Sequence, residues 1–163
     1  MSCTSGLTFK EADEAEDSDE TDDDVYFIAM HTRPYEKLIV WKEAHDLCLW
    51  VYKQSRSFPD HERNRLVGQM CRSAYGVPMN IAEGNAKRTK KDKARFFDIA
   101  IGSLEELHYQ CRLARDLSYL SPQLFADADD RIQRTSFLLT KLRSAVLTSS
   151  ESSASSASSA SSV

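Results

Sequence analysis

Apolar residues between about residues 36 and 148 recur at alternating steps of three and four, which places them on one face of an α-helix. Four segments show this pattern, and short stretches containing Pro, Gly, Ser or Thr separate them. None of them alternates apolar and polar residues one by one, as a half-buried strand would. The pattern therefore predicts an all-α fold.

The first predicted helix covers residues 36–56. Pro59 follows it closely and should end it, and Asp60 should cap the next helix. The positions expected to face inward are Leu38, Trp41, Ala44 or His45, Cys48, Val51 and Tyr52.

The second predicted helix covers residues 61–85. Pro78 lies inside it, lacks an N–H and crowds the carbonyl of Ala74, which predicts a kink rather than a stop. Gly84 is expected to end the helix. The inward line is Leu66, Met70, Ser73, Val77 and Ile81.

The third and fourth predicted helices have clear start signals. Thr89 and Asp92 have the spacing of a capping box, and Ser121 precedes Pro122 as a cap precedes proline in a first turn. The inward line of the third helix is Phe97, Ala100, Leu104, Leu107, Cys111 and Ala114. The inward line of the fourth is Phe125, Ala128, Ile132, Thr135, Leu139, Leu142 and Val146.

Four helices of about 20 to 30 residues with short connections pack most simply as an antiparallel up-down-up-down four-helix bundle. Further apolar residues widen the inward stripe of the first and fourth helices. They are Val40, Leu47, Leu49, Trp50, Leu138 and Ala145. Such a stripe either covers a wide core in one subunit or is buried between subunits, and we expect the second, that is, a homo-oligomer.

Charge is distributed unevenly along the chain. Residues 1–30 contain ten acidic residues and one Lys. Residues 149–163 are Ser and Ala apart from Val163 and a single charged residue, Glu151. Neither segment has an apolar face, so both are expected to be disordered. The formal net charge of the whole chain is −4, whereas residues 31–148 carry +6. The acidic balance therefore conceals a basic folded domain over residues 31–148.

No basic-then-apolar leader and no apolar run of membrane-spanning length is present, which makes a cytoplasmic protein the default expectation. Cys48, Cys71 and Cys111 lie among apolar residues of the predicted helices, where a reduced Cys packs as a small hydrophobic residue. Disulfide pairing of these residues with one another or with Cys3 is the less favoured alternative.

Candidate catalytic chemistry is sparse. No nucleophile and base have a recognisable spacing, and there is no Gly-rich phosphate loop. His108 and Cys111 share a helical face, but two ligands are too few for a structural metal site. We therefore expect no enzyme activity, no cofactor and no metal.

The strongest functional signal is a basic cluster between the second and third predicted helices. Asp92 is the only opposing charge there, and cations at a helix start oppose the helix dipole, so fold stability alone does not explain the cluster. A phosphate backbone or an acidic partner would bind it, although a lysine-rich solvated surface is the plainer alternative. The cluster consists of Lys87, Arg88, Lys90, Lys91, Lys93 and Arg95, and Arg72 is added as a further cation of the candidate nucleic-acid site.

Residues 80–84, with the sequence Asn-Ile-Ala-Glu-Gly, follow the predicted kink. Glu83 is the acid most suited to a special role there, because it and Asn80 flank an apolar turn. Its expected role is structural: it should bond loop backbone or pair with Arg72 or another cation near the helix end. Catalysis by Glu83 is the minority alternative.

The Asn80 to Gly84 block, together with Gly-Ser-Leu-Glu-Glu-Leu at residues 102–107, resembles the four-helix-bundle proteins encoded in 23S rRNA intervening sequences. The likeness covers about residues 35–147, and the long terminal segments depart from the usual short form of the family. It implies a homopentamer around a central channel. It also implies kinship with the accessory variability proteins of diversity-generating retroelements, which bind a reverse transcriptase and nucleic acid. No catalytic residue is carried over. Further positions shared with the family are Leu38, Val40, Trp41, Ala44, Phe58, Pro59, Glu62, Leu66, Gln69, Arg72 to Ala74, Val77, Pro78, Ala100 and Ile101.

The sequence as a whole predicts a non-enzymatic, homo-oligomeric binding module that contacts RNA or a ribonucleoprotein through its basic cluster. The alternative is an accessory subunit whose main partner is a polymerase such as a reverse transcriptase. Added salt separates the two, because binding to phosphates weakens steeply with salt and an apolar protein interface does not.

Overall fold

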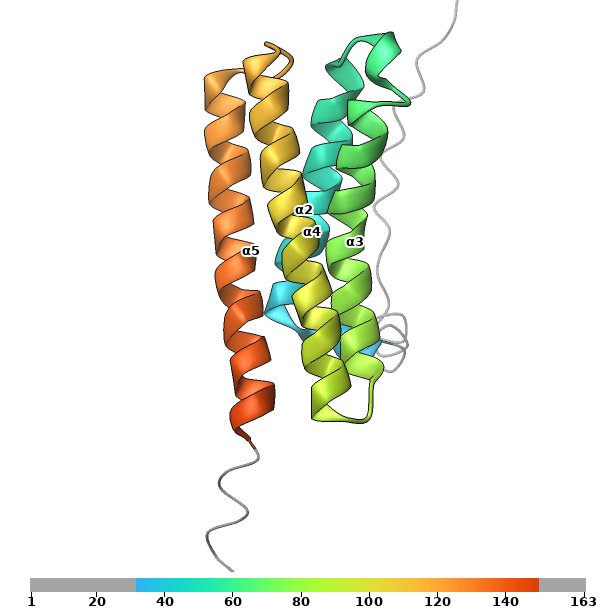
Figure 1. Cartoon of the computed structure of the whole chain (residues 1–163), viewed down its shortest axis with the longest axis vertical. Coiled ribbons are helices and arrows are strands. Elements are labelled where there is room, and N and C mark those ends of the chain that lie inside the picture. Colours follow the sequence, from blue (N-terminus) through green and yellow to red (C-terminus); the bar gives the residue numbers. More distant parts are fainter. Residues whose placement is uncertain (1–31, 150–163) are drawn as a thin grey trace, which may run out of the picture. The chain divides into compact units, whose positions relative to one another are not determined.

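The computed structural model describes residues 32–149, and four long helices make up most of this range (Figure 1). No strand occurs within it, so the all-α prediction is confirmed. The helices are α2 (Ile39–Gln54), α3 (Leu66–Ala86), α4 (Lys90–Asp116) and α5 (Pro122–Thr148). Three short 3-10 helices are η1 (Pro34–Lys37), η2 (Ser55–Ser57) and η3 (Asp60–Glu62).

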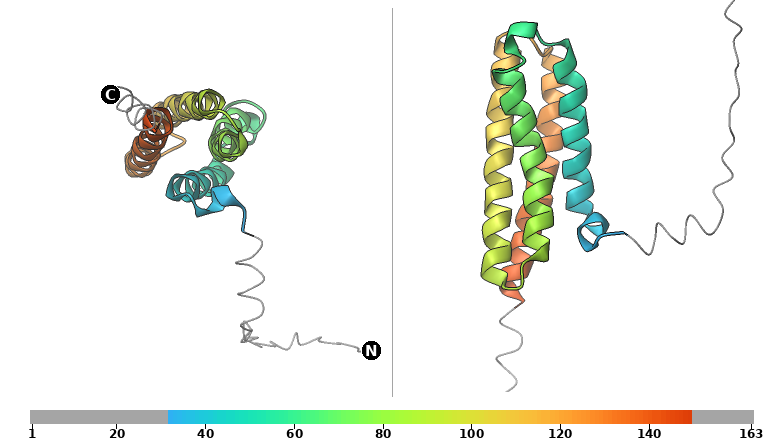
Figure 2. Two further views of the ribbon diagram at one scale, coloured as in Figure 1. Left: turned by 90° about the horizontal axis from the view of Figure 1, so that it is seen from below. Right: turned by 90° about the vertical axis from the view of Figure 1, so that its right-hand side faces the viewer.

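Successive helices run in opposite directions along the bundle (Figures 1 and 2). Each helix packs on two others: α3 on α2 and α4, and α5 on α4 and α2. This is the up-down-up-down arrangement that short connections impose. One end of the bundle therefore gathers the start of α2, the end of α3, the start of α4 and the end of α5.

The two predicted start signals are confirmed. The Thr89 hydroxyl accepts a hydrogen bond from the backbone N–H of Asp92 at 3.1 Å, and the Ser121 hydroxyl accepts one from the N–H of Leu124 at 3.2 Å. Each bond satisfies an N–H that the helix itself leaves without a partner. Pro122 occupies the first turn of α5, where its missing N–H costs nothing.

The bounds predicted for the first two helices were wrong. Pro34 starts η1, and the extended backbone of Leu38 separates it from α2, which shortens the expected helix at its start. Asp60 does not cap α3. It starts η3 instead, and α3 begins only at Leu66, after Arg65, whose side chain makes no capping bond. The local turn chemistry of residues 58–65 thus delays the helix.

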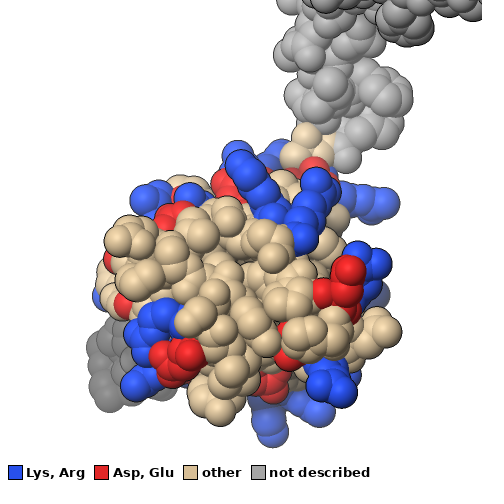
Figure 3. Space-filling model, turned by 90° about the horizontal axis from the view of Figure 1, so that it is seen from above, with Lys and Arg blue, Asp and Glu red and all other residues tan. Residues whose placement is uncertain are grey.

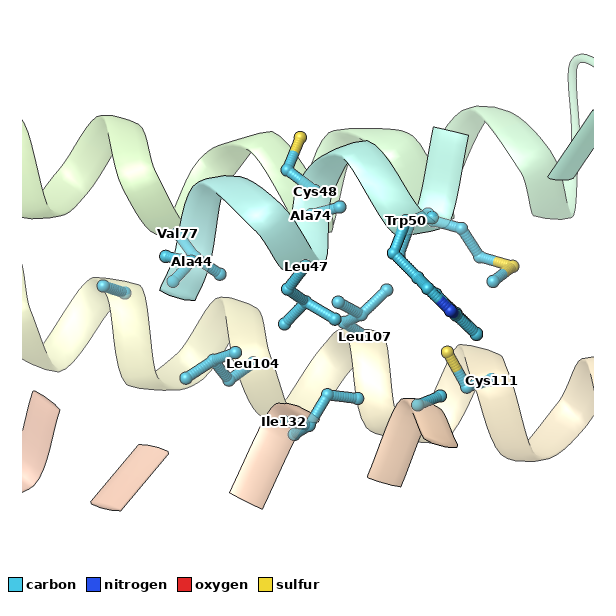
Figure 4. Close-up of a cluster of buried hydrophobic side chains, with 14 of the residues drawn as sticks. Ala44, Leu47, Cys48, Trp50, Ala74, Val77, Leu104, Leu107, Cys111 and Ile132 are labelled. Carbon is cyan, nitrogen blue, oxygen red and sulfur yellow. The ribbon is translucent and has the colours of Figure 1, made fainter. Parts of the chain in front are cut away.

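The core is a single cluster to which all four helices contribute (Figure 4). Leu47 from α2, Val77 from α3, Leu107 from α4 and Leu139 from α5 are almost completely buried. The predicted inward lines of α3 and α4 are confirmed, and Ala44 rather than His45 faces inward in α2. Tyr52 was predicted to face inward but is 45% exposed.

Half of the residues interpreted as an intersubunit stripe are buried inside this chain. Val40, Leu47 and Trp50 are buried in the core, which explains their apolar character without a second subunit. Leu49 and Ala145 are exposed, and Leu138 is half-buried. The stripe is wide because α2 contacts both α3 and α5, and each contact needs its own row of side chains.

Polar contacts join α2 to α5 beside this core. The indole Nε1 of Trp50 donates to Asp127 Oδ2 at 2.7 Å, and Asp127 also accepts from Arg131 Nε at 2.8 Å. A second link is the ion pair between Arg134 and Glu43, with 2.6 Å between nitrogen and oxygen. The bond to Asp127 satisfies the Trp50 indole N–H at the edge of the core, where an unpaired donor would be unfavourable.

The helix α3 continues through Pro78, so the prediction that proline would not stop it is confirmed. Asn80 Nδ2 donates to the carbonyl oxygen of Gly76 at 2.7 Å, which adds a side-chain bond in the turn that proline deprives of one backbone bond. This gives Asn80 a structural role in the helix.

Gly84 was predicted to end α3, and this was wrong: the helix runs on to Ala86, and Gly84 is buried within it. A Cβ at this position would lie 2.8 Å from Cε1 of Phe97 and 3.0 Å from Cβ of Phe96. The glycine is therefore required by the close approach of α4, because any side chain would displace the two phenylalanines.

The predicted disordered segments, residues 1–30 and 150–163, lie outside the described residues. Among the helices of residues 32–149, none combines the length and the apolar character that a membrane crossing requires.

Substitution of Gly84 by Ala should destabilise the bundle by roughly 1 to 3 kcal/mol, because the added methyl overpacks the contact with Phe97. Gly102 is the matched control: it lies in α4, and nothing lies within 4 Å of a Cβ built on it. Gly102→Ala should instead stabilise by about 0.5 to 1 kcal/mol through helix propensity. Thermal and urea unfolding followed by circular dichroism measure both. Equal effects of the two substitutions would contradict the close-approach explanation.

Candidate nucleic-acid interface

The basic cluster lies at one end of the bundle, where α3 ends and α4 begins. Only residues 87–89 connect the two helices. Phe96 and Phe97 of α4 pack against Gly84 of α3, which keeps the two helices close together at this short turn. The end of α5 reaches the same part of the molecule, since Arg143 and Leu147 line a hollow together with residues at the start of α4. The view along the bundle from this end is the left panel of Figure 2.

The cap at the start of α4 holds the nearest acid, Asp92, in place by hydrogen bonds. Asp92 Oδ2 accepts a hydrogen bond of 2.6 Å from the Thr89 hydroxyl, while the Asp92 N–H donates to that hydroxyl. The capping-box spacing is thus used, with the return bond made to the hydroxyl. Because Asp92 is engaged locally and is favourable at a helix N-terminus, it does not pair with any lysine of the cluster in the described residues.

Two of the six predicted cations stabilise the turn itself. Lys87 Nζ lies 3.0 Å from Glu83 Oε1 and 4.4 Å from the centre of the Phe96 ring. Lys93 Nζ donates to the carbonyl oxygen of Asn85 at 2.9 Å and so binds an end carbonyl of α3. These contacts give Lys87 and Lys93 a structural reason to be present.

The remaining four cations, Arg88, Lys90, Lys91 and Arg95, are exposed, and none has a side-chain partner within residues 32–149. Three of them line a hollow of about 890 Å³ between the start of α4 and the end of α5. Its lining is Lys90, Lys91, Asp92, Ala94, Arg95, Asp98, Arg143 and Leu147.

Arg143 is a member of this surface that the sequence did not indicate. Its guanidinium pairs with Asp98 through two hydrogen bonds, one from Nε to Oδ1 and one of 3.1 Å from Nη2 to Oδ2. The hydrogen bonding and the charge of Asp98 raise the pKa of Arg143 above its usual value. Residues 98 and 143 are far apart in the sequence, so no local spacing could have revealed the pair.

Free cations at this position oppose the dipole of α4, whose N-terminus already carries a partial positive charge. At the opposite end of the bundle, the centre consists of uncharged residues and charged side chains lie around the rim (Figure 3). Exposed cations without an ion pair within residues 32–149 also occur at that end, for example Lys53 and Arg112, but these lie near helix C-termini, where the dipole favours them. The cations of the basic end are distinct because they lie at a helix start.

Arg72 does not lie with this cluster. It is on α3, fifteen residues before Lys87, which corresponds to roughly 22 Å along a helix. There it lines a separate groove between α3 and α4. Arg72 and residues 87–95 were predicted to belong to one site, and in the structure they lie at two separate locations.

The family block at residues 80–84 has structural roles in this fold. Glu83 pairs with Lys87, which confirms the expected pairing with a cation near the helix end but excludes Arg72 as that cation. Asn80 bonds the Gly76 carbonyl, and Gly84 admits Phe97. None of the three contributes a free cation to the basic end.

His108 and Cys111 do not approach a common point. His108 Nε2 lies 3.3 Å from Asp129 Oδ1 on α5, whereas Cys111 is fully buried in the core. Burial raises the pKa of the Cys111 thiol to about 12, so it stays protonated at neutral pH. Within residues 32–149 no three His, Cys, Asp or Glu side chains are grouped as metal ligands.

A family model described as 23S rRNA-intervening sequence protein matches residues 36–141. The chain belongs to this family. The matched range contains α2, α3, α4 and most of α5, and it includes every cation predicted for the interface. The resemblance carried by the Asn80 to Gly84 block is therefore confirmed.

The fold of this 23S rRNA-intervening sequence protein is similar to a solved structure. That structure is a crystal structure of a protein of unknown function from the S23 ribosomal protein family of Bacteroides thetaiotaomicron. The two chains are 17% identical with a TM-score of 0.59, and the match covers 64% of this chain and 98% of the other. No match was found among curated proteins.

Loss of the Thr89 cap should destabilise the start of α4. Thr89→Ala removes the acceptor of the Asp92 N–H, so the free energy of unfolding should fall by about 1 kcal/mol. Ser144→Ala is the matched control, because Ser144 is exposed in the interior of α5 and its hydroxyl caps no helix. Urea unfolding measures both. A loss no larger for Thr89→Ala than for Ser144→Ala would contradict the cap.

Proposed function

We propose that this protein is a non-enzymatic, homo-oligomeric binding module that contacts RNA, alone or in a ribonucleoprotein, through the basic end of the bundle. The observation that carries the proposal is the set of four exposed cations, Arg88, Lys90, Lys91 and Arg95, which have no partner within residues 32–149. Cations held at a helix start against the dipole are expected where an anion is the ligand.

The acids nearby form no ion pair with these four cations within residues 32–149. Asp92 is bonded to Thr89, Asp98 to Arg143 and Glu83 to Lys87, so each acid is already engaged. A phosphate backbone can therefore approach the four cations without first breaking an ion pair. Binding of this kind releases counterions and is driven largely by electrostatics.

Charge reversal tests the proposal. The triple variant Lys90→Glu, Lys91→Glu, Arg95→Glu should bind a short fluorescently labelled RNA roughly ten- to a hundredfold more weakly at low salt. The slope of log affinity against log salt should become smaller by about 3, one for each phosphate that the variant no longer neutralises. Fluorescence anisotropy at several salt concentrations gives both quantities.

The matched control reverses the same number of charges at the other end of the bundle, with Lys53→Glu, Arg56→Glu and Arg112→Glu. These three side chains are also exposed and without an ion pair within residues 32–149. The control should keep most of the affinity. Equal losses in both triples would contradict a localised site. Binding of a polymerase that resists added salt, without RNA binding, would favour the accessory-subunit alternative.

The homo-oligomeric part of the proposal is supported by an apolar groove of about 390 Å³ between α2 and α3. It contains the stacked pair Trp41 and His45, whose ring centres are 5.1 Å apart, and the exposed Tyr52. Exposed aromatic surface of this kind is typical of contacts between proteins. A second copy of the chain is the proposed occupant, and the family resemblance suggests five copies.

Charged substitutions in this groove should dissociate the proposed oligomer into species of smaller mass. The double variant Tyr52→Lys, Ala82→Lys places two positive charges in the α2/α3 groove. Burying unpaired charges between two apolar surfaces is costly, so the contact between copies should be lost. Ile99→Lys with Phe137→Lys is the control, because both are exposed apolar residues outside this groove. Native mass spectrometry and light scattering measure the assembly. A monomeric wild-type protein at micromolar concentration would overturn the oligomeric part.

A further inference from the structure

A second groove, the α3/α4 groove, lies on the outer side of the bundle and has a volume of about 590 Å³. This is within the range of about 300 to 1,000 Å³ that is usual for small-molecule sites. The lining includes Arg72, Tyr75, Met79 and Asn80 from α3, and Ser103 and Glu106 from α4. It is the place to which the structure assigns Arg72, away from the basic end.

Three polar side chains of the α3/α4 groove are fixed by hydrogen bonds. Ser73 donates to Glu106 Oε2 at 3.2 Å, Asn80 Nδ2 donates to Gly76 at 2.7 Å, and Ser103 donates to the Ile99 carbonyl at 3.2 Å. The three bonds use donors of the groove. Glu106 and Asn80 each keep an acceptor oxygen without a partner within residues 32–149. The fixed groups therefore offer acceptors to a ligand.

The other two features of the groove are a free cation and an exposed apolar edge. Arg72 is exposed and has no side-chain partner within residues 32–149. Tyr75 is 40% and Met79 is 61% exposed, and both side chains line the groove. A flat aromatic ring beside a guanidinium is a suitable surface for a nucleobase and its phosphate.

The α3/α4 groove is within reach of the basic end. Glu106 follows Arg95 by eleven residues on α4, which corresponds to roughly 16 Å along the helix. A nucleic-acid strand advances about 3.4 Å per nucleotide when its bases are stacked. A strand with phosphates on the basic end therefore reaches Glu106 within about five nucleotides.

We propose that the α3/α4 groove holds one unpaired base of the RNA strand that the basic end binds, and that Glu106 selects a base with an exocyclic amine. This inference rests on the proposed function and adds base preference to it. A single strand is required, because the bases of an A-form duplex are paired and cannot enter a groove on a helix surface.

The selection follows from the donor and acceptor pattern. A carboxylate only accepts hydrogen bonds, and cytosine presents an amine where uracil presents a carbonyl oxygen. Uracil would therefore place a carbonyl oxygen against the carboxylate of Glu106. Arg72 in the same groove would bind the adjacent phosphate and compensate for the charge of Glu106.

The test compares two neighbouring carboxylates of α4. Glu106→Gln keeps the shape of the side chain and an acceptor for Ser73, but it adds a donor to the groove. Glu105→Gln makes the same change in charge at an exposed residue that lines a different hollow, on the α5 side of α4. Labelled oligocytidine and oligouridine of equal length are the probes, with binding measured by anisotropy at low salt.

Wild-type protein and Glu105→Gln should bind oligocytidine at least about fivefold more tightly than oligouridine, the lower end of what one well-placed base contact supplies. Glu106→Gln should reduce this ratio to below about twofold, mainly by binding oligouridine better. Circular dichroism checks that the substitutions leave the bundle folded. Equal ratios for Glu106→Gln and Glu105→Gln would overturn the inference, as would a wild-type protein with no base preference.

Two further measurements separate this inference from the proposed function. If the triple reversal at the basic end abolishes binding while Glu106→Gln changes no ratio, the inference fails and the proposed function stands. If neither oligonucleotide binds wild-type protein, the proposed function fails first. Cytidine monophosphate that binds as tightly as oligocytidine would also overturn the inference, because the groove would then act without the basic end.

Discussion

The contact between Gly84 and Phe97 is the constraint on which the arrangement of the basic end depends. Without a side chain at residue 84, the last turns of α3 lie against the first turns of α4, and three residues suffice to connect the helices. Close packing of this kind leaves little room for the end of α3 and the start of α4 to shift relative to each other. The cations that follow Gly84 are therefore held on a rigid surface.

The cations at that end are divided into two groups by what they contact. Lys87 and Lys93 bind groups of α3 and hold the turn, whereas Arg88, Lys90, Lys91 and Arg95 face solvent. The first group lowers the free energy of the fold, and the second raises it slightly through the dipole of α4. A large core shared by four helices can offset that small cost.

The helix α3 connects the surfaces to which functions are assigned. One side of it forms the aromatic α2/α3 groove, the other side forms the polar α3/α4 groove, and its end carries the basic turn. Tyr75 and Met79 line both grooves and form the ridge between them. Self-association and ligand binding would therefore use two sides of one helix and share the ridge formed by Tyr75 and Met79.

The sequence alone determined the all-α class, the caps at Thr89 and Ser121, the inward lines of α3 and α4, and the basic cluster, because each depends on residues within a turn or two of one another. Tertiary structure alone decided the roles of residues whose partners are distant. Gly84 proved to be a packing position, Trp50 and Val40 core residues, Arg143 a partner of Asp98, and Arg72 part of a separate groove. Local spacing carries no information on which helices meet, and these roles are set by that meeting.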